Sequence, residues 1–125
     1  MSRSIKIWLL MAAVVSLAGC GKKVPEPANP DTARQALTEA LNTWVQGGSV
    51  ESLSKRTPPI YFNDPQWKAG KRLKRFEIKG NLEEFGRQLR CTVLLAFEDE
   101  EGKTEEKDTP YQIDTHEVIV IVRDF

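Results

Sequence analysis

The chain has 125 residues, in which 18 lysines and arginines balance 18 aspartates and glutamates. This charge balance argues against a nucleic-acid-binding domain, which is normally clearly basic. One histidine and two cysteines also exclude the usual His and Cys metal clusters, so no metal or cofactor site is predicted. The length beyond the apolar N-terminus suits one domain with a single modest core.

Residues 1–19 have the organisation of a cleaved signal peptide. Arg3 and Lys6 precede an apolar stretch from Ile7 to Ser16, and small residues follow it. The apolar run ends at Gly19 and falls short of the roughly 20 residues that a bilayer-spanning helix needs. A plain secretory signal is the alternative, because small residues precede the cleavage site in both kinds of signal.

The four residues that close this run are Leu17-Ala18-Gly19-Cys20. They resemble the lipobox of bacterial lipoprotein signal peptides at every position. The resemblance implies cleavage before Cys20, followed by a thioether-linked diacylglyceryl group and an acylated amine on Cys20. Two or more acyl chains anchor a protein stably, whereas one binds reversibly. We therefore expect lipid attachment at Cys20 and a membrane-anchored location in the bacterial cell envelope, facing the periplasm or the exterior.

Residues 20–30 are predicted to tether the domain to its anchor. They show no apolar periodicity and contain three prolines in their second half. Proline biases such a segment to the extended polyproline II conformation, at about 3.1 Å per residue, which allows a reach of roughly 30 Å from the lipid. Lys22 and Lys23 are either a weak second membrane contact or a solvated flank.

The single domain is predicted over residues 31–125 and begins with a helix over residues 31–45. Asp31 is the expected N-cap, and Gly47-Gly48 provides the stop. An apolar stripe at helical spacing consists of Ala33, Leu37, Leu41, Trp44 and Val45. Ser49 is expected to cap a second, shorter helical segment that ends at Thr57-Pro58-Pro59.

Residues 60–70 predict a short turn, with Asp64 as N-cap, Pro65 as its first residue and Gly70 closing it. The aromatic residues Phe62 and Trp67 within it have two interpretations. In the first, they line a ligand-binding site, because aromatic side chains offer a flat apolar surface to a ligand. In the second, they cover the open edge of the sheet or the helix. The second is favoured, because a pocket also needs convergent polar groups.

The remaining sequence predicts four strands over residues 72–79, 87–98, 103–114 and 117–124, with residues 99–102 as a hairpin loop. Pro110 places a bulge or an edge in the third strand. Val118 to Val122 is apolar on both faces, which suits a central strand covered on both sides. Cys91 shares a face with apolar neighbours, so a small buried hydrophobe is favoured over a nucleophile or an intermolecular bridge.

Two sets of charges lie on these strands and loops. The acidic set predicts either a cation-binding loop or a solvated one, and it lacks the ligand spacing of a Ca²⁺ loop. The basic set predicts either an acidic partner or ion pairs across strands with these acids, and the second is preferred. The sets are Asp99, Glu100, Glu101, Glu105, Glu106 and Asp108, and Lys68, Lys71, Arg72, Lys74, Arg75 and Lys79.

The element order predicts an α+β fold in which the N-terminal helix packs on a curved antiparallel sheet of about four strands. In the order of their helices and strands, residues 31–125 resemble the cystatin-like group of α+β cones. This group includes the nuclear-transport-factor-like and SnoaL-like domains. Three local stretches are similar to small envelope proteins of planctomycete bacteria that carry no known activity. They are residues 63–70 followed by Leu73, then Leu89-Arg90-Cys91, and the closing Val120-Ile121-Val122-Arg123.

Enzymes of the cone group commonly hold a carboxylate or His base and a Tyr or Asp donor inside the cone, which makes Tyr111, Asp114 and His116 the candidates here. Asp114 would orient His116 as the base, and Tyr111 would donate to an oxyanion. Against this, Asp114-Thr115-His116 falls where two strands must turn.

We therefore predict a non-enzymatic binding or interaction domain without catalytic residues. Its expected partners are the membrane, through the Cys20 lipid, and an envelope protein, but no nucleic acid. A lipid-anchored isomerase or hydrolase is the alternative. An enclosed cavity lined by Tyr111, Asp114 or His116 would favour the enzyme, and a core filled by side chains would favour the binding domain.

Overall fold

The computed structural model describes residues 28–124, so the predicted signal peptide and the lipid site at Cys20 lie outside the described residues. The described chain has an α+β fold, as predicted. Its elements are α1 (Pro30–Val45), the 3₁₀ helix η3 (Val50–Lys55), β1 (Ile60–Asn63), α2 (Pro65–Lys68), β2 (Arg72–Phe85), β3 (Gln88–Glu98), β4 (Thr104–Asp114) and β5 (Ile119–Arg123).

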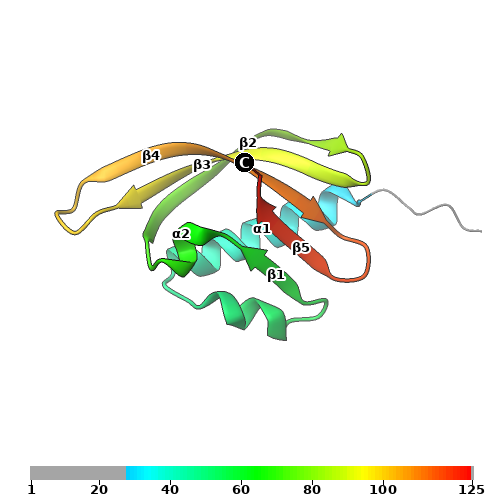
Figure 1. The fold of residues 1–125 in the computed structure, drawn as a ribbon, viewed down its shortest axis with the longest axis horizontal. Helices are drawn as coiled ribbons and strands as arrows, with labels where there is room; N and C mark the ends of the chain where they lie inside the picture. Colours follow the sequence, from blue (N-terminus) through cyan, green and yellow to red (C-terminus); the bar gives the residue numbers. More distant parts are fainter. Residues whose placement is uncertain (1–27, 125) are drawn as a thin grey trace, which may run out of the picture.

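The strands form one mixed sheet of five strands in the order β1-β5-β4-β3-β2 (Figure 1). The prediction of about four antiparallel strands is therefore wrong in one element, β1. This strand pairs in parallel with β5, from Ile60 opposite Ile119 to Asn63 opposite Val122. Residues 60–63 are too few for an alternating pattern to stand out, and their partner lies 59 residues later in the chain. Local sequence therefore predicts only a turn here.

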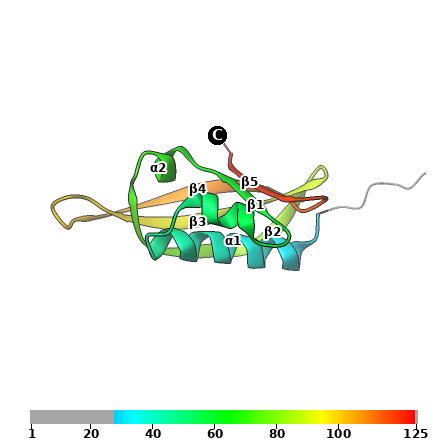
Figure 2. The same cartoon turned by 90° about the horizontal axis from the view of Figure 1, so that it is seen from below.

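Helix α1 lies along one face of the curved sheet (Figure 2). Its buried side chains are Ala33, Ala36, Leu37, Ala40, Leu41 and Trp44. The predicted stripe is confirmed except at Val45, which is 37% exposed. The N-cap is Asn29 rather than Asp31, because the Asn29 side chain accepts hydrogen bonds from the backbone N–H groups of Asp31 and Thr32. Proline at the first helical position suits this start.

The domain begins earlier than predicted. Ala28 is 4% exposed and belongs to the hydrophobic core, although residues 20–30 were expected to be tether. The backbone N–H of Asn29 donates a hydrogen bond of 2.8 Å to the hydroxyl of Thr115, in the loop between β4 and β5. The chain is therefore fixed to the domain from Ala28 onward.

Strand β2 continues to Phe85, six residues past its predicted end at Lys79. A register shift between Lys79 and Glu83 interrupts its pairing with β3. Gly80 lies in this shift with a φ of 67°, a conformation that glycine adopts without steric cost. The irregularity hides the alternating pattern, which explains why the strand predicted from the sequence stops at Lys79.

The third predicted strand, β4, is neither bulged at Pro110 nor an edge strand, because it lies between β5 and β3 and its register with β3 is unbroken there. β4 pairs with β3 over its whole length, but with β5 only from Tyr111 to Asp114. Pro110 therefore lies at the last position before the second neighbour joins, where a missing N–H is tolerated. β5 itself lies between β1 and β4. Its Ile119 and Ile121 are buried, whereas Val120 and Val122 are half-buried, so only one face is fully covered.

Aromatic side chains fill the space between α1, α2 and the sheet. Trp44 stacks on Trp67 with ring centroids 5.1 Å apart, and Phe62 lies 5.4 Å from both Trp67 and Tyr111. The indole N–H of Trp44 donates to the carbonyl of Lys71 at 2.8 Å. Phe62 and Trp67 are buried against the helices and the sheet, as favoured above, although the edge of Trp67 borders a surface depression with Trp44 and Gly70.

Ion pairs cross the strands on the sheet face opposite α1, which confirms the predicted cross-strand pairing. Arg75 pairs with Glu106, and the Lys79 Nζ lies 3.1 Å from an Asp108 oxygen. Arg72 reaches Glu98 at 3.6 Å. Within residues 28–124 the other members of the basic set, Lys68, Lys71 and Lys74, form no ion pair. The acidic loop is a hairpin, in which Asp99 accepts from the N–H groups of Glu101 and Lys103.

Candidate functional site

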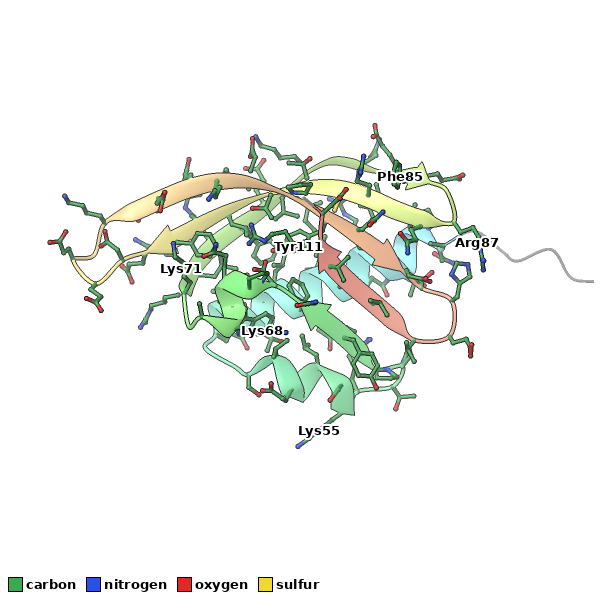
Figure 3. The ribbon with its side chains drawn as sticks, viewed as in Figure 1. Lys55, Lys68, Lys71, Phe85, Arg87 and Tyr111 are labelled. Atoms are coloured by element: carbon green, nitrogen blue, oxygen red, sulfur yellow. The ribbon has the colours of Figure 1, made fainter. Side chains whose placement is uncertain are left out.

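The structure separates the three candidate residues into two places, and Figure 3 shows Tyr111 at the first of them, inside the domain. Tyr111 is fully buried inside the domain, whereas Asp114 and His116 lie at the end of β4 and in the loop after it. Side chains alternate between the two faces of a strand, so Tyr111 and Asp114, three residues apart, point to opposite faces of the sheet. The expected donor and the expected base pair therefore do not converge.

Tyr111 belongs to a buried polar cluster with Asp64 and Arg123. Its hydroxyl donates to one carboxylate oxygen of Asp64, a residue that is 1% exposed. The Arg123 guanidinium lies 2.9 Å from both oxygens of the same carboxylate. Burial, together with the neighbouring Asp64 charge and the hydrogen bond to it, raises the pKa of Tyr111 far above its ordinary value. Tyr111 is thus held as a neutral donor.

The Asp64 carboxylate has no capacity left for a substrate. Besides Tyr111 and Arg123, it accepts the backbone N–H of Gln66 at 2.8 Å, which makes it the N-cap of α2 as predicted. One end of the cluster comes from the β1–α2 junction and the other from β4 and β5. The cluster therefore joins the short parallel strand to the rest of the sheet, and its chemistry is that of a structural ion pair.

The sequence analysis missed Arg123, although a signal is present. Period-2 alternation places Arg123 on the same face of β5 as the buried Ile119 and Ile121. A cation on an apolar face needs a buried counter-charge, since an unpaired one is very costly. Asp64 is the counter-charge that Arg123 reaches among the described residues, and the Arg123 Nε has no hydrogen-bond partner there.

Asp114 and His116 do contact each other. The Asp114 carboxylate accepts the backbone N–H of His116 at 3.0 Å and also bonds the His116 Nδ1. Partial burial acts to raise the pKa of Asp114, but the hydrogen bonds and charge of His116 outweigh it and hold that pKa below its ordinary value. This arrangement closes the loop that the sequence predicts at these residues.

The pair borders an open depression at one end of the sheet. The lining residues come from the β2–β3 turn and the β4–β5 loop: Phe85, Gly86, Arg87, Gln88, Asp114 and His116. Phe85 is 48% exposed, and the Arg90 guanidinium covers one face of its ring at 3.9 Å. This depression is shallow surface and not the enclosed interior that a cone enzyme would use.

Cys91 is buried on β3, opposite Tyr111 on β4. Burial raises the pKa of its thiol to about 11, only partly offset by Arg34. A thiol of this kind is protonated at neutral pH and is a poor nucleophile. The interpretation of Cys91 as a small buried hydrophobe is confirmed.

Within residues 28–124, no three His, Cys, Asp or Glu side chains are placed to hold a metal ion. The helices described in the same range include none that is long and apolar enough to cross a membrane. Comparison with protein-family models, with curated proteins and with solved structures finds no match for this chain.

Proposed function

We propose that this chain is a lipid-anchored cell-envelope protein whose domain binds a partner near the membrane and performs no catalysis. The anchor is assigned to Cys20 by the Leu17-Ala18-Gly19-Cys20 sequence and the apolar run before it. The membrane is one partner, through the lipid, and an envelope protein is the other; nucleic acid is not among them. The envelope location, on the periplasmic or outer side, follows from the same signal.

The observation that supports a binding domain is the filled interior. At the place where a cone enzyme would hold its substrate, Tyr111 packs against Phe62 and donates to Asp64. The aromatic contacts continue from there to Trp67 and Trp44. A site for chemistry needs space within hydrogen-bond reach of its acid and base, and here side chains occupy that space.

The proposed fold relationship is with the cystatin-like cones. The long N-terminal helix, the short helical piece and the curved sheet follow in the order of that group, and α1 lies on one face of the sheet (Figure 2). The proposed relationship concerns the fold and implies no activity for this chain.

A lipid-anchored isomerase or hydrolase is the second candidate, and one observation favours it. Asp114 and His116 are hydrogen-bonded, as an orienter and a base would be, and they border a depression with the cationic Arg87. In this arrangement His116 would remove a proton from a substrate lying on the surface. The open setting would leave that substrate in water, where general-base catalysis gains little from its surroundings.

Two measurements separate these functions. Turnover of ester and carbonyl substrates by the purified protein, lost in His116→Ala and kept in the neighbouring Glu117→Ala, would establish the enzyme and overturn our proposal. We expect no turnover by the parent protein or by either variant. Crosslinking in intact envelopes should then join the chain to a protein partner, and a domain that crosslinks to lipid alone would contradict the binding role.

A further inference from the structure

We propose that the β2–β3 turn, residues 85–87, is the membrane-facing surface of the domain, with Phe85 entering the lipid headgroup region. The inference rests on the proposed anchor at Cys20 and adds the orientation of the domain and the surface that meets the lipid. It is carried by where the chain enters the domain, by the length of the tether, and by an exposed aromatic side chain at that point.

The chain enters the domain beside this turn. Asn29 is bonded to Thr115, and the residues on both sides of Thr115 line the same depression as Phe85 and Arg87. Figure 3 shows Phe85 and Arg87 at the end of the molecule where α1 begins. The end of the domain that carries this turn is therefore the end nearest to the proposed lipid on Cys20.

The tether is short compared with the domain. Eight residue steps separate Cys20 from Ala28, the first fixed residue, and fully extended they span at most about 29 Å. β3 has 11 residues and joins the β2–β3 turn at one end to the β3–β4 turn at the other. At about 3.3 Å per residue these turns lie roughly 35 Å apart. The β3–β4 turn therefore reaches the lipid only if the domain inverts.

Phe85 supplies the apolar contact. Only three large hydrophobic side chains are exposed within residues 28–124, namely Val45, Tyr61 and Phe85. Of these, Phe85 alone lines the depression beside Thr115, whereas Tyr61 lies on β1 at the opposite edge of the sheet. Arg90 holds its ring from one side. A half-exposed ring can partition into the headgroup boundary, and the tether raises its effective concentration there, so that a weak contact suffices.

Charge at this end does not drive the contact. Arg87 forms no direct ion pair within the described range, but its charge already acts on the Asp114 carboxylate across the depression. Glu83, Glu84 and Glu117 are also exposed nearby, and Asp114 offsets His116. These acids would oppose attraction to an anionic surface. We therefore expect the contact to depend on Phe85 and to respond little to salt or to anionic lipid content.

The test uses the full chain, processed in a bacterial host, purified and placed in phosphatidylethanolamine–phosphatidylglycerol vesicles. The mass of its N-terminal peptide is measured first and reports whether Cys20 is acylated. An environment-sensitive fluorophore is then attached at Glu84→Cys, beside the turn, or at Glu101→Cys, in the β3–β4 turn, while Cys91 stays buried. Emission wavelength and quenching by iodide report contact with lipid at each position.

We expect blue-shifted, iodide-protected emission at position 84 and neither effect at position 101. Phe85→Ser should abolish the protection at position 84. Tyr61→Ser, which removes an aromatic of nearly equal exposure from β1, should leave it unchanged. Equal quenching at both positions in an acylated protein would overturn the orientation and leave the anchor standing. Protection that is also present in the soluble Cys20→Ser chain, with neither vesicles nor detergent added, would show a second copy covering Phe85, which also overturns it. An unacylated Cys20 would overturn the anchor and this inference together.

Discussion

The buried pair of Asp64 and Arg123 makes the sharpest prediction about stability. Asp64 is fully buried, and the Arg123 side chain is 10% exposed, so each charge depends on the other for compensation. Removing one partner from a buried ion pair costs about 3–5 kcal/mol, because the other charge is left uncompensated. A domain of roughly 100 residues has about 5–15 kcal/mol of stability in total. Asp64→Ala alone should therefore bring the domain close to unfolding.

The double variant should be less damaged than the sum of its parts. Asp64→Ala with Arg123→Met removes both charges together, and it leaves the Tyr111 hydroxyl without its acceptor, at about 1–3 kcal/mol. We expect the two single changes to be non-additive by about 2–3 kcal/mol, near the upper end for residues in direct contact.

The assay is urea denaturation followed by circular dichroism, applied to the parent, both single variants and the double variant. A matched control is the exposed pair of Arg75 and Glu106, whose partners are about half exposed. There Arg75→Met and Glu106→Ala should each change the stability by no more than about 1 kcal/mol. Strict additivity at Asp64 and Arg123 would refute the argument that their charges compensate each other in the core.

The sequence predicts well what depends on local periodicity. The α1 stripe, the β3–β4 hairpin at Asp99 and the N-cap at Asp64 are each encoded within a few neighbouring residues, and the structure confirms all three. Pro110 is a weaker local signal: its missing N–H predicts a bulge or an edge strand, and the structure places it in an interior strand, just outside the ladder with β5.

What the sequence could not supply depends on distant contacts. The pairing of β1 with β5 and the ion pair of Asp64 with Arg123 each join residues 59 apart along the chain. The N-cap is misplaced by two residues for a different reason, since Asn29 and Asp31 are both good capping residues and only geometry decides between them. The separation of Tyr111 from Asp114, in contrast, follows from the alternation of side chains along the single strand β4, and the sequence already contained that signal.

Four further predictions concern the core and the titrating groups. Trp44→Ala should cost about 3–5 kcal/mol, since it empties the stack on Trp67, and an unchanged melting temperature would contradict the packing. Cys91 should resist alkylation at pH 8 until urea is added; equal rates in both conditions would show that it is accessible. Burial raises the pKa of Cys91 from 9.0 to about 11. The stabilisation from the protonated thiol is therefore complete below pH 9 and is lost as the pH rises to 11. Cys91→Ala should remove this contribution to the loss of stability at alkaline pH. The lowered pKa of Asp114 gives the opposite dependence of stability on pH. The stabilisation from the Asp114 carboxylate is present above the ordinary carboxyl pKa of 3.8 and is lost as the pH falls through the folded-state pKa. Asp114→Asn should flatten that acid loss in urea midpoints measured at successive pH values, and an identical acid profile would count against the His116 contact.

Metabolic labelling with palmitate tests the central claim, the lipid anchor, most directly. Cells expressing the parent chain or Cys20→Ser are labelled and fractionated. The parent should carry the label and sediment with membranes, because Cys20 is the only acceptor that the lipobox offers. Cys20→Ser should carry none and should be either uncleaved or released in soluble form. Label retained in Cys20→Ser, or an unlabelled parent, would contradict the account.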